Sequence, residues 1–273
     1  MSRFGYTSLG FGSGSSAPFT NVSSVSFDGV DDYCYNDDVT SAFSVGTGAF
    51  SVSLWVYPRS TPGVEIAFTT FHGPATPNYW DDYSGIYIQW VQYGIWRAGT
   101  SSKTGGVGPF TYIDTAASYS KDNWFNLVFT RDGAQGLTLY VNGSSAVAAA
   151  EASPTDVTAD DNGLGVGSGW YFDDPPPPAP GGPGGNFNSV PCNCLIDEVA
   201  LFTSELTAGQ VDTLYNNPDG PTNLDAFAVA PALWWRMGDG TEQESGTTIY
   251  DMSANSHNAT LYNGPTYSST VPS

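Results

Sequence analysis

The residues of this chain that could do chemistry are mainly aspartates. The 273-residue sequence has 21 Asp, six Glu and only seven basic residues. Aspartate is favoured in turns and in the oxygen cages that hold calcium. The segment Asp28-Gly29-Val30-Asp31-Asp32 gathers three of them between two alternating stretches. From the residues alone, this segment is expected to be a turn in which the aspartates serve the backbone geometry.

Aromatic residues in loops form a second chemically capable group. Tyr79-Trp80-Asp81-Asp82-Tyr83 lies in a proline-rich connection, and Trp170-Tyr171 comes shortly before a run of four prolines. Trp and Tyr rings stack on the apolar faces of sugars while polar neighbours bond the hydroxyls. We therefore predict five glycan-binding residues: Tyr79, Trp80, Tyr83, Trp170 and Tyr171. Such aromatics suit a protein–protein contact equally well.

A hydrolytic centre is not indicated. Retaining glycosidases need two carboxyl groups about 5 Å apart, a spacing that alternate residues of one strand provide. Among the six Glu only Glu242 and Glu244 are spaced in this way, and they lie in a polar turn. The two histidines, His72 and His257, have no nucleophile partner in the sequence. We predict a non-enzymatic protein, with a polysaccharide-degrading glycoside hydrolase as the less favoured alternative.

The formal net charge of −20 excludes several partners. A surface this acidic repels phosphate backbones and anionic lipids, so we expect no nucleic-acid binding and no membrane insertion. Residues 1–18 lack the apolar core of a Sec signal, and no apolar run reaches the length of a membrane span. Three cysteines do not make a disulfide framework. A bridge from Cys34 to Cys192 or Cys194 and buried free thiols are both open interpretations.

Alternating apolar residues predict a series of β-strands, most clearly at residues 50–56. Asn142-Gly143 indicates a hairpin, and Thr207 to Gln210 has the spacing of a helix capping box. Further strands are expected at residues 25–27, 33–35, 65–71, 85–90, 124–130, 136–141, 163–167, 195–202 and 259–262, and one short helix at 208–216. This pattern predicts an all-β fold, an antiparallel two-sheet jelly-roll sandwich.

Composition divides the chain into three parts. Residues 1–20 are rich in Gly and Ser and are expected to form an N-terminal arm. Residues 21–217 are expected to form the jelly roll, and residues 218–273 a C-terminal extension packed on it. Asp173 to Gly185 contains four consecutive prolines and fits neither a strand nor a helix.

Five segments, in order, resemble the laminin-G-like, concanavalin A-like jelly-roll family. They are residues 25–33, 50–56, 124–133, 139–143 and 196–202. The resemblance implies a two-sheet sandwich, a lectin-like domain and a structural Ca²⁺ at its edge. It also implies that the first and last strands are neighbours, which would bring Asp197 to the Asp28-Gly29 turn. The predicted metal ligands are therefore Asp28, Gly29, Asp31 and Asp197.

The C-terminal extension carries a second resemblance. Residues 233–240 and 249–255, with the ending Val271-Pro272-Ser273, look like the extension of marine tailed-phage virion proteins that contain such a domain. This implies a virion surface or appendage protein, located on the extracellular particle without Sec export, that binds host glycans or another virion protein. The alternative is a purely structural capsid or tail decoration protein without sugar binding. Either role is compatible with a homo-oligomer.

Overall fold

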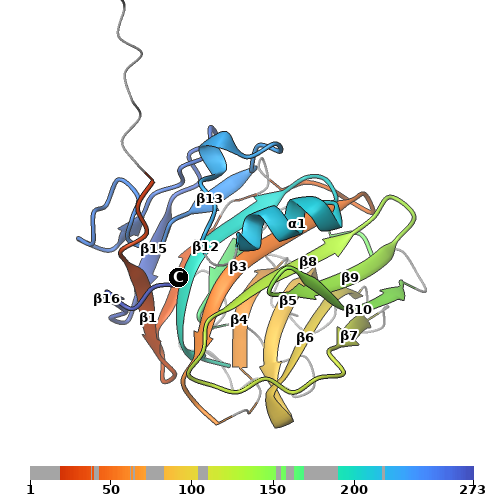
Figure 1. Ribbon diagram of the computed structural model, residues 1–273, viewed down its shortest axis with the longest axis horizontal. Coiled ribbons are helices and arrows are strands. Elements are labelled where there is room, and N and C mark those ends of the chain that lie inside the picture. The colour runs from red at the N-terminus through yellow and green to blue at the C-terminus, as the bar shows by residue number, and fades with distance from the viewer. Residues whose placement is uncertain are drawn as a thin grey trace, which may run out of the picture.

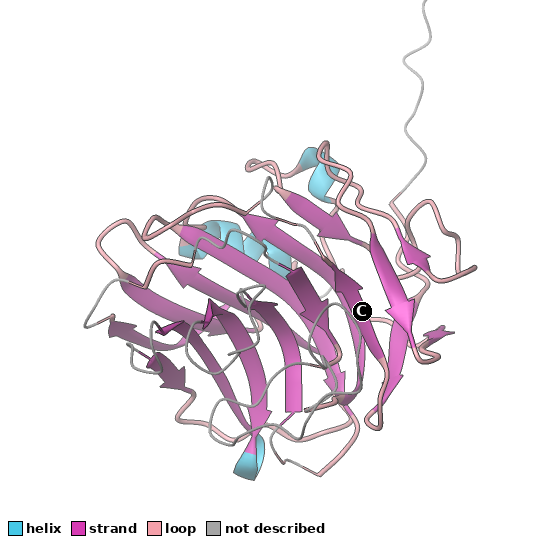
Figure 2. Cartoon of the chain, turned by 180° about the vertical axis from the view of Figure 1, so that it is seen from behind, coloured by secondary structure: helices cyan, strands magenta, loops and turns pink. Residues whose placement is uncertain are grey.

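Two antiparallel β-sheets face each other, with one α-helix on the outside (Figure 1 and Figure 2). The computed structural model describes residues 19–37, 39, 43–61, 63, 65–71, 83–103, 110–151, 155–157, 163–168, 190–216 and 219–273. The predicted all-β jelly-roll sandwich with one short helix is thereby confirmed. No helix within these residues is long and apolar enough to cross a bilayer.

Each sheet joins strands from distant parts of the sequence. The elements are β1 (Ser24–Asp28), β2 (Tyr33–Asn36), β3 (Phe50–Pro58), β4 (Glu65–Phe71), β5 (Tyr83–Val91), η1 (Gln92–Gly94), β6 (Ile95–Lys103), β7 (Phe110–Asp114), β8 (Phe125–Arg131), β9 (Gly136–Val141), β10 (Ser144–Ala150), β11 (Gly163–Val166), β12 (Asn193–Phe202), α1 (Ala208–Tyr215), η2 (Leu224–Ala226), β13 (Leu233–Trp235), β14 (Thr248–Ile249), β15 (Ala259–Tyr262) and β16 (Thr266–Ser268). The first sheet has the order β10-β9-β8-β3-β12-β1-β16, with β13 beside β12. The second has the order β14-β15-β2-β11-β4-β5-β6-β7.

The main core lies between the sheets and follows the two-residue period of the strands. On β3 the alternate residues Phe50, Val52, Leu54 and Val56 enter this core. The opposite sheet contributes large side chains such as Trp90, which is fully buried. Alternation of this kind is what made the strands predictable, because only one face of each strand must be apolar.

Helix α1 covers the outer face of the first sheet, in front of β3 and β12 in Figure 1. It begins with the predicted capping box of Thr207 and Gln210, and it ends at Asn216 in the left-handed conformation. Val211 and Leu214 of the helix are buried against an outer apolar cluster that includes residues of β8, β9, β12 and β13. The helix is thus held by burial of one face rather than by its length.

The C-terminal segment adds strands to both sheets. β13 pairs with β12 and β16 with β1 in the first sheet, while β15 pairs with β2 in the second. Trp234 and Trp235 are adjacent and both buried, Trp235 in the main core and Trp234 in the outer cluster. Residues 219–273 therefore contribute strands to both sheets of the sandwich.

The cysteines do not form the bridge from Cys34. Cys192 is bonded to Cys194, and Cys34 is a free, buried thiol in the main core. Cys192 and Cys194 are two residues apart on an extended segment, so their side chains lie on the same face and their sulfur atoms are neighbours.

Candidate functional site

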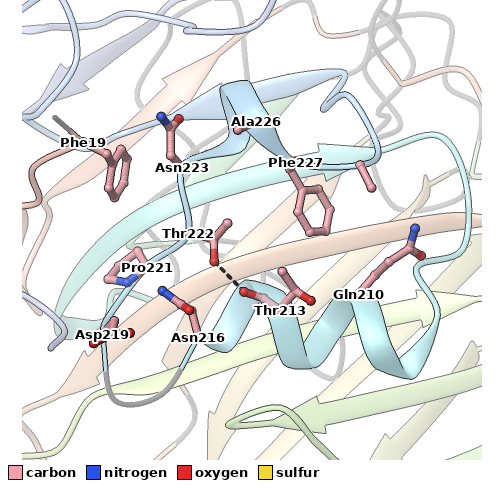
Figure 3. Close-up of a pocket in the computed structure, with 11 residues that line it drawn as sticks. Phe19, Gln210, Thr213, Asn216, Asp219, Pro221, Thr222, Asn223, Ala226 and Phe227 are labelled. Carbon is pink, nitrogen blue, oxygen red and sulfur yellow. Dashed lines mark hydrogen bonds between the residues drawn. The ribbon is translucent and has the colours of Figure 1, made fainter. Parts of the chain in front are cut away.

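A groove lies between α1 and the segment of residues 219–228, above the outer face of the first sheet (Figure 3). Its volume is about 520 Å³. Two aromatic rings, three amides and one carboxylate give it its chemical character: Phe19, Phe227, Gln210, Asn216, Asn223 and Asp219. Aromatic and amide groups side by side are the chemistry that carbohydrate sites use.

Hydrogen bonds within the chain orient two of the amides. The side-chain oxygen of Gln210 accepts the Thr207 N–H at 2.8 Å, and that of Asn223 accepts the Asp225 N–H at 3.0 Å. Because each oxygen is already engaged in a cap, each NH₂ group is left to donate. Asp219 is exposed and supplies an acceptor. The groove therefore offers both donors and an acceptor.

The two walls of the groove are joined directly. The Thr222 hydroxyl donates a hydrogen bond to the carbonyl of Thr213 in α1 (Figure 3). Phe227 packs against Phe202 of the outer cluster, with ring centres 5.9 Å apart. Both walls thus rest on the same apolar cluster, and the groove is preformed by the fold.

Arg236 holds Phe19 at one end of the groove. Its guanidinium carbon lies 4.3 Å from the centre of the Phe19 ring, within cation–π distance. Its Nη2 donates to the Thr20 carbonyl, and its Nε donates to the Glu198 carboxylate at 3.0 Å. Arg236 therefore fixes the chain before β1 against the C-terminal segment, which positions an aromatic wall of the groove.

Glu198 and its neighbour Asp197 form a buried acidic pair behind this contact. Burial raises the pKa of Glu198 to about 7, although Arg236 and the Trp234 indole, which hydrogen-bond its carboxylate, oppose the shift. Burial, and then the charge of Glu198, raise the pKa of Asp197, whose carboxylate accepts a hydrogen bond from Asn21. Both carboxyl groups behind the groove therefore release their protons at a higher pH than exposed carboxyl groups do.

The acidic turn before β2 is a separate cluster of carboxylates. Asp28, Asp31 and Asp32 each place a carboxylate oxygen within 4.8 Å of the others. Asp28 Oδ1 accepts the Val30 N–H at 2.7 Å, and Asp32 Oδ2 accepts the Asp28 N–H at 3.0 Å. Burial raises the pKa of Asp32, and the charges of Asp28 and Asp31 add to this. Three convergent carboxylates fit the oxygen chemistry that calcium prefers.

Asp197 is not part of this turn, which corrects the predicted ligand set. β1 does pair with β12, but the register places Asn193 opposite Asp28, so Asp197 lies four residues further along the strand. Asp32 joins the cluster in its place. Gly29 occupies the turn with a φ of +77°, and a side chain there would collide with Asn193.

The predicted aromatic site falls largely outside the described residues. Tyr79, Trp80, Trp170 and Tyr171 all lie there. Tyr83 is the first residue of β5, where its backbone pairs with Lys103 of β6. The prediction for these five residues therefore stays a prediction.

Sequence reasoning did not find the groove. In the sequence, Gln210 is predicted only as part of a helix cap. The groove exists because residues 219–228 fold back beside α1, which makes Phe227 and Phe19 two separate parts of one lining. The spacing of these residues in the sequence carries no signal of that contact.

A family comparison decides the classification of this fold. The model of the concanavalin A-like lectin/glucanases superfamily matches residues 28–212, which run from the acidic turn to α1. This chain belongs to that superfamily. No curated protein matches the sequence.

Solved structures of the superfamily fold are distant in sequence. A protein from Bacteroides ovatus, assigned as carbohydrate-binding, is 14% identical with a TM-score of 0.60, over 93% of this chain and 61% of its own. The chain thus spans less than two thirds of that protein. The CBM40 of the Ruminococcus gnavus IT-sialidase is 9% identical with a TM-score of 0.53, over 72% of this chain and 99% of its own. The same module bound to α2,3-sialyllactose gives a TM-score of 0.51 at 9% identity, over 72% of this chain and 100% of its own. At these identities the likeness shows the fold alone.

Proposed function

We propose that this protein is a non-enzymatic, lectin-like protein that binds a glycan in the groove between α1 and residues 219–228. The observation that carries the proposal is the lining of the groove. Phe19 and Phe227 offer apolar ring faces, amide NH₂ groups offer donors, and Asp219 offers an acceptor. A sugar presents C–H faces and hydroxyls that both donate and accept, so it matches each of these groups.

The lining of the groove favours binding over hydrolysis. Glycosidases need two carboxyl groups flanking the scissile bond. Among the described residues that line the groove, Asp219 is the only carboxylate. A glycan held here has one acceptor beside it and lacks the second carboxyl group that either hydrolytic mechanism requires.

Blocking the groove with a bulky side chain tests the proposal. Ala226 lines the groove and is exposed, so Ala226→Trp fills it without entering the core. Glycan-array binding should fall at least tenfold in this variant. Ala148→Trp on β10 is the matched control, since Ala148 is exposed and does not line the groove. Equal binding by wild type, A226W and A148W would contradict the proposal.

The acidic turn is proposed as a structural calcium site. Asp28, Asp31 and Asp32 would hold the ion. A bound Ca²⁺ would neutralise three carboxylates that otherwise repel one another, and it would brace the turn between β1 and β2. It would not take part in glycan binding at the groove, because no residue of the turn lines the groove.

The place of action is proposed to be the surface of a virion. The support is the resemblance of residues 233–240 and 249–255 to the extensions of tailed-phage virion proteins. Mass spectrometry of purified particles from the source would detect the protein at a constant copy number per particle. Absence of the protein from the particles would contradict the proposed location on a virion. It would not affect the proposed lectin-like role.

A further inference from the structure

The described lining of the groove contains an acid and several amides but no basic side chain. Its only charged member is Asp219, whose side chain is exposed. We propose that the glycan bound here is neutral, without sialic acid, uronic acid, sulfate or phosphate groups. This inference rests on the proposed function and names its substrate class.

The basic side chains that the structure describes are committed elsewhere. Arg236 is the one that approaches the groove, but it is bound to Glu198 and lies over the Phe19 ring instead of lining the groove. The others pair with or donate to residues away from it: Arg59, Arg97, Arg131 and Lys121. An anionic sugar would therefore find no counter-charge among these side chains.

An anionic sugar in the groove would instead meet repulsion. A carboxylate about 4 Å from Asp219 is disfavoured by roughly 1 kcal/mol in water and by more where water is excluded. The formal net charge of −20 adds a long-range repulsion for any polyanion. Together these effects predict at least a tenfold preference for a neutral glycan over its charged counterpart.

A neutral sugar satisfies the groups that are present. Its hydroxyls can donate to Asp219 and accept from the NH₂ groups of Gln210 and Asn223, while its C–H face covers an aromatic ring. Each polar group of the groove then exchanges a bond to water for a bond to the ligand. The geometry thus favours a ligand whose polarity comes from hydroxyls and amides rather than from charge.

Matched polysaccharide pairs test the inference with the full chain. The probes are dextran with dextran sulfate, and methyl-esterified with de-esterified polygalacturonate, on an array that also carries neutral and sialylated oligosaccharides. Binding is measured in about 0.15 M and 1 M NaCl, because 1 M salt shortens the screening length to about 3 Å and removes the long-range part of the repulsion. A preference for neutral members that persists in 1 M NaCl is expected.

Asp219→Asn isolates the local charge. This variant should gain about fivefold in binding to the de-esterified probe, relative to Asp225→Asn, which changes the net charge equally at an exposed residue outside the groove. Tighter binding of sialylated or uronate glycans by wild type would overturn the neutral-glycan inference and leave the lectin role standing. Binding to no glycan in either salt would overturn the proposed function itself.

Discussion

The groove and the acidic turn differ in how far apart their residues lie in the sequence. The carboxylates of the turn come from one short segment, Asp28 to Asp32, whereas the groove joins Phe19 to residues of 210–228. The turn therefore needs little beyond its own backbone, while the groove depends on contacts that hold distant segments together. Substitutions that loosen the contacts between these segments should alter glycan binding and should leave the carboxylate cluster of the turn in place.

The largest effect is expected from Arg236→Ala. The variant leaves Glu198 buried without its cation and releases Phe19, so the free energy of unfolding should fall by about 3 kcal/mol. Glycan affinity should fall with it, while the response to calcium remains. Lys121→Ala is the control, because Lys121 forms an exposed pair with Asp122 that is worth at most about 1 kcal/mol. Equal free energies of unfolding for both variants, measured by chemical denaturation, would contradict the stabilising role of Arg236.

The pH dependence of stability should come from the support of the groove. The pKa of Glu198 is raised from its ordinary 4.5 to about 7, so the folded state binds this proton more tightly than the unfolded state. The associated stabilisation is complete below pH 4.5 and is lost as the pH rises towards 7. Asp197 shifts in the same direction.

We therefore expect the free energy of unfolding to drop by up to about 3 kcal/mol between pH 5 and pH 8. Glu198→Gln should flatten this dependence, as measured by denaturation at both pH values. If the free energy of unfolding of the wild type rises between pH 5 and pH 8 instead, burial does not raise the pKa values of Asp197 and Glu198.

Calcium should act on the turn alone. At a concentration 100 times its dissociation constant, a bound ion adds about 2.7 kcal/mol to the free energy of unfolding, so Tm should rise by several degrees and return on chelation. Asp31→Asn should abolish the shift, whereas Asp225→Asn, at an exposed residue outside the turn, should not. Glycan affinity should be equal with calcium and with chelator. Loss of glycan binding on chelation would show that glycan binding depends on the bound calcium, which would contradict two independent sites.

The smallest effect is expected from Thr222→Val. The substitution removes the hydrogen bond from the Thr222 hydroxyl to the Thr213 carbonyl and nothing from the core. The free energy of unfolding should fall by about 1 kcal/mol, and glycan affinity by a few-fold because one of the hydrogen bonds that join the walls is lost. Titration of a glycan from the array would measure this. Unchanged affinity would show that the width of the groove does not depend on this bond.

The sequence permitted a correct prediction of the fold because its strongest signals are local. Strand β3 alternates apolar and polar residues, Asn142-Gly143 makes the hairpin between β9 and β10, and Thr207 with Gln210 caps α1. Among the strands that were not predicted are β6 and β10. The first carries Gly, Thr and Ser in place of a clear alternation, and the second is an exposed edge strand of Ser and Ala.

The candidate sites were also predictable only as far as their residues lie close together in the sequence. Asp28 and Asp31 lie in one cluster of carboxylates, since a turn brings neighbours together whatever the rest of the chain does, and their role as metal ligands stays a prediction. Asp197 was placed there wrongly, because strand order alone does not fix register. The groove could not be predicted, since Phe19 and Phe227 line it only through the packing of segments that lie far apart in the sequence.

The most direct test of the central claim is the crystal structure of the protein with a neutral oligosaccharide that it binds on the array. We predict a sugar ring in the groove, against Phe19 or Phe227 and within hydrogen-bond distance of Asn216, Asn223 or Asp219. A sugar bound instead at the acidic turn, or beside Trp80 and Trp170, with an empty groove, would contradict the account.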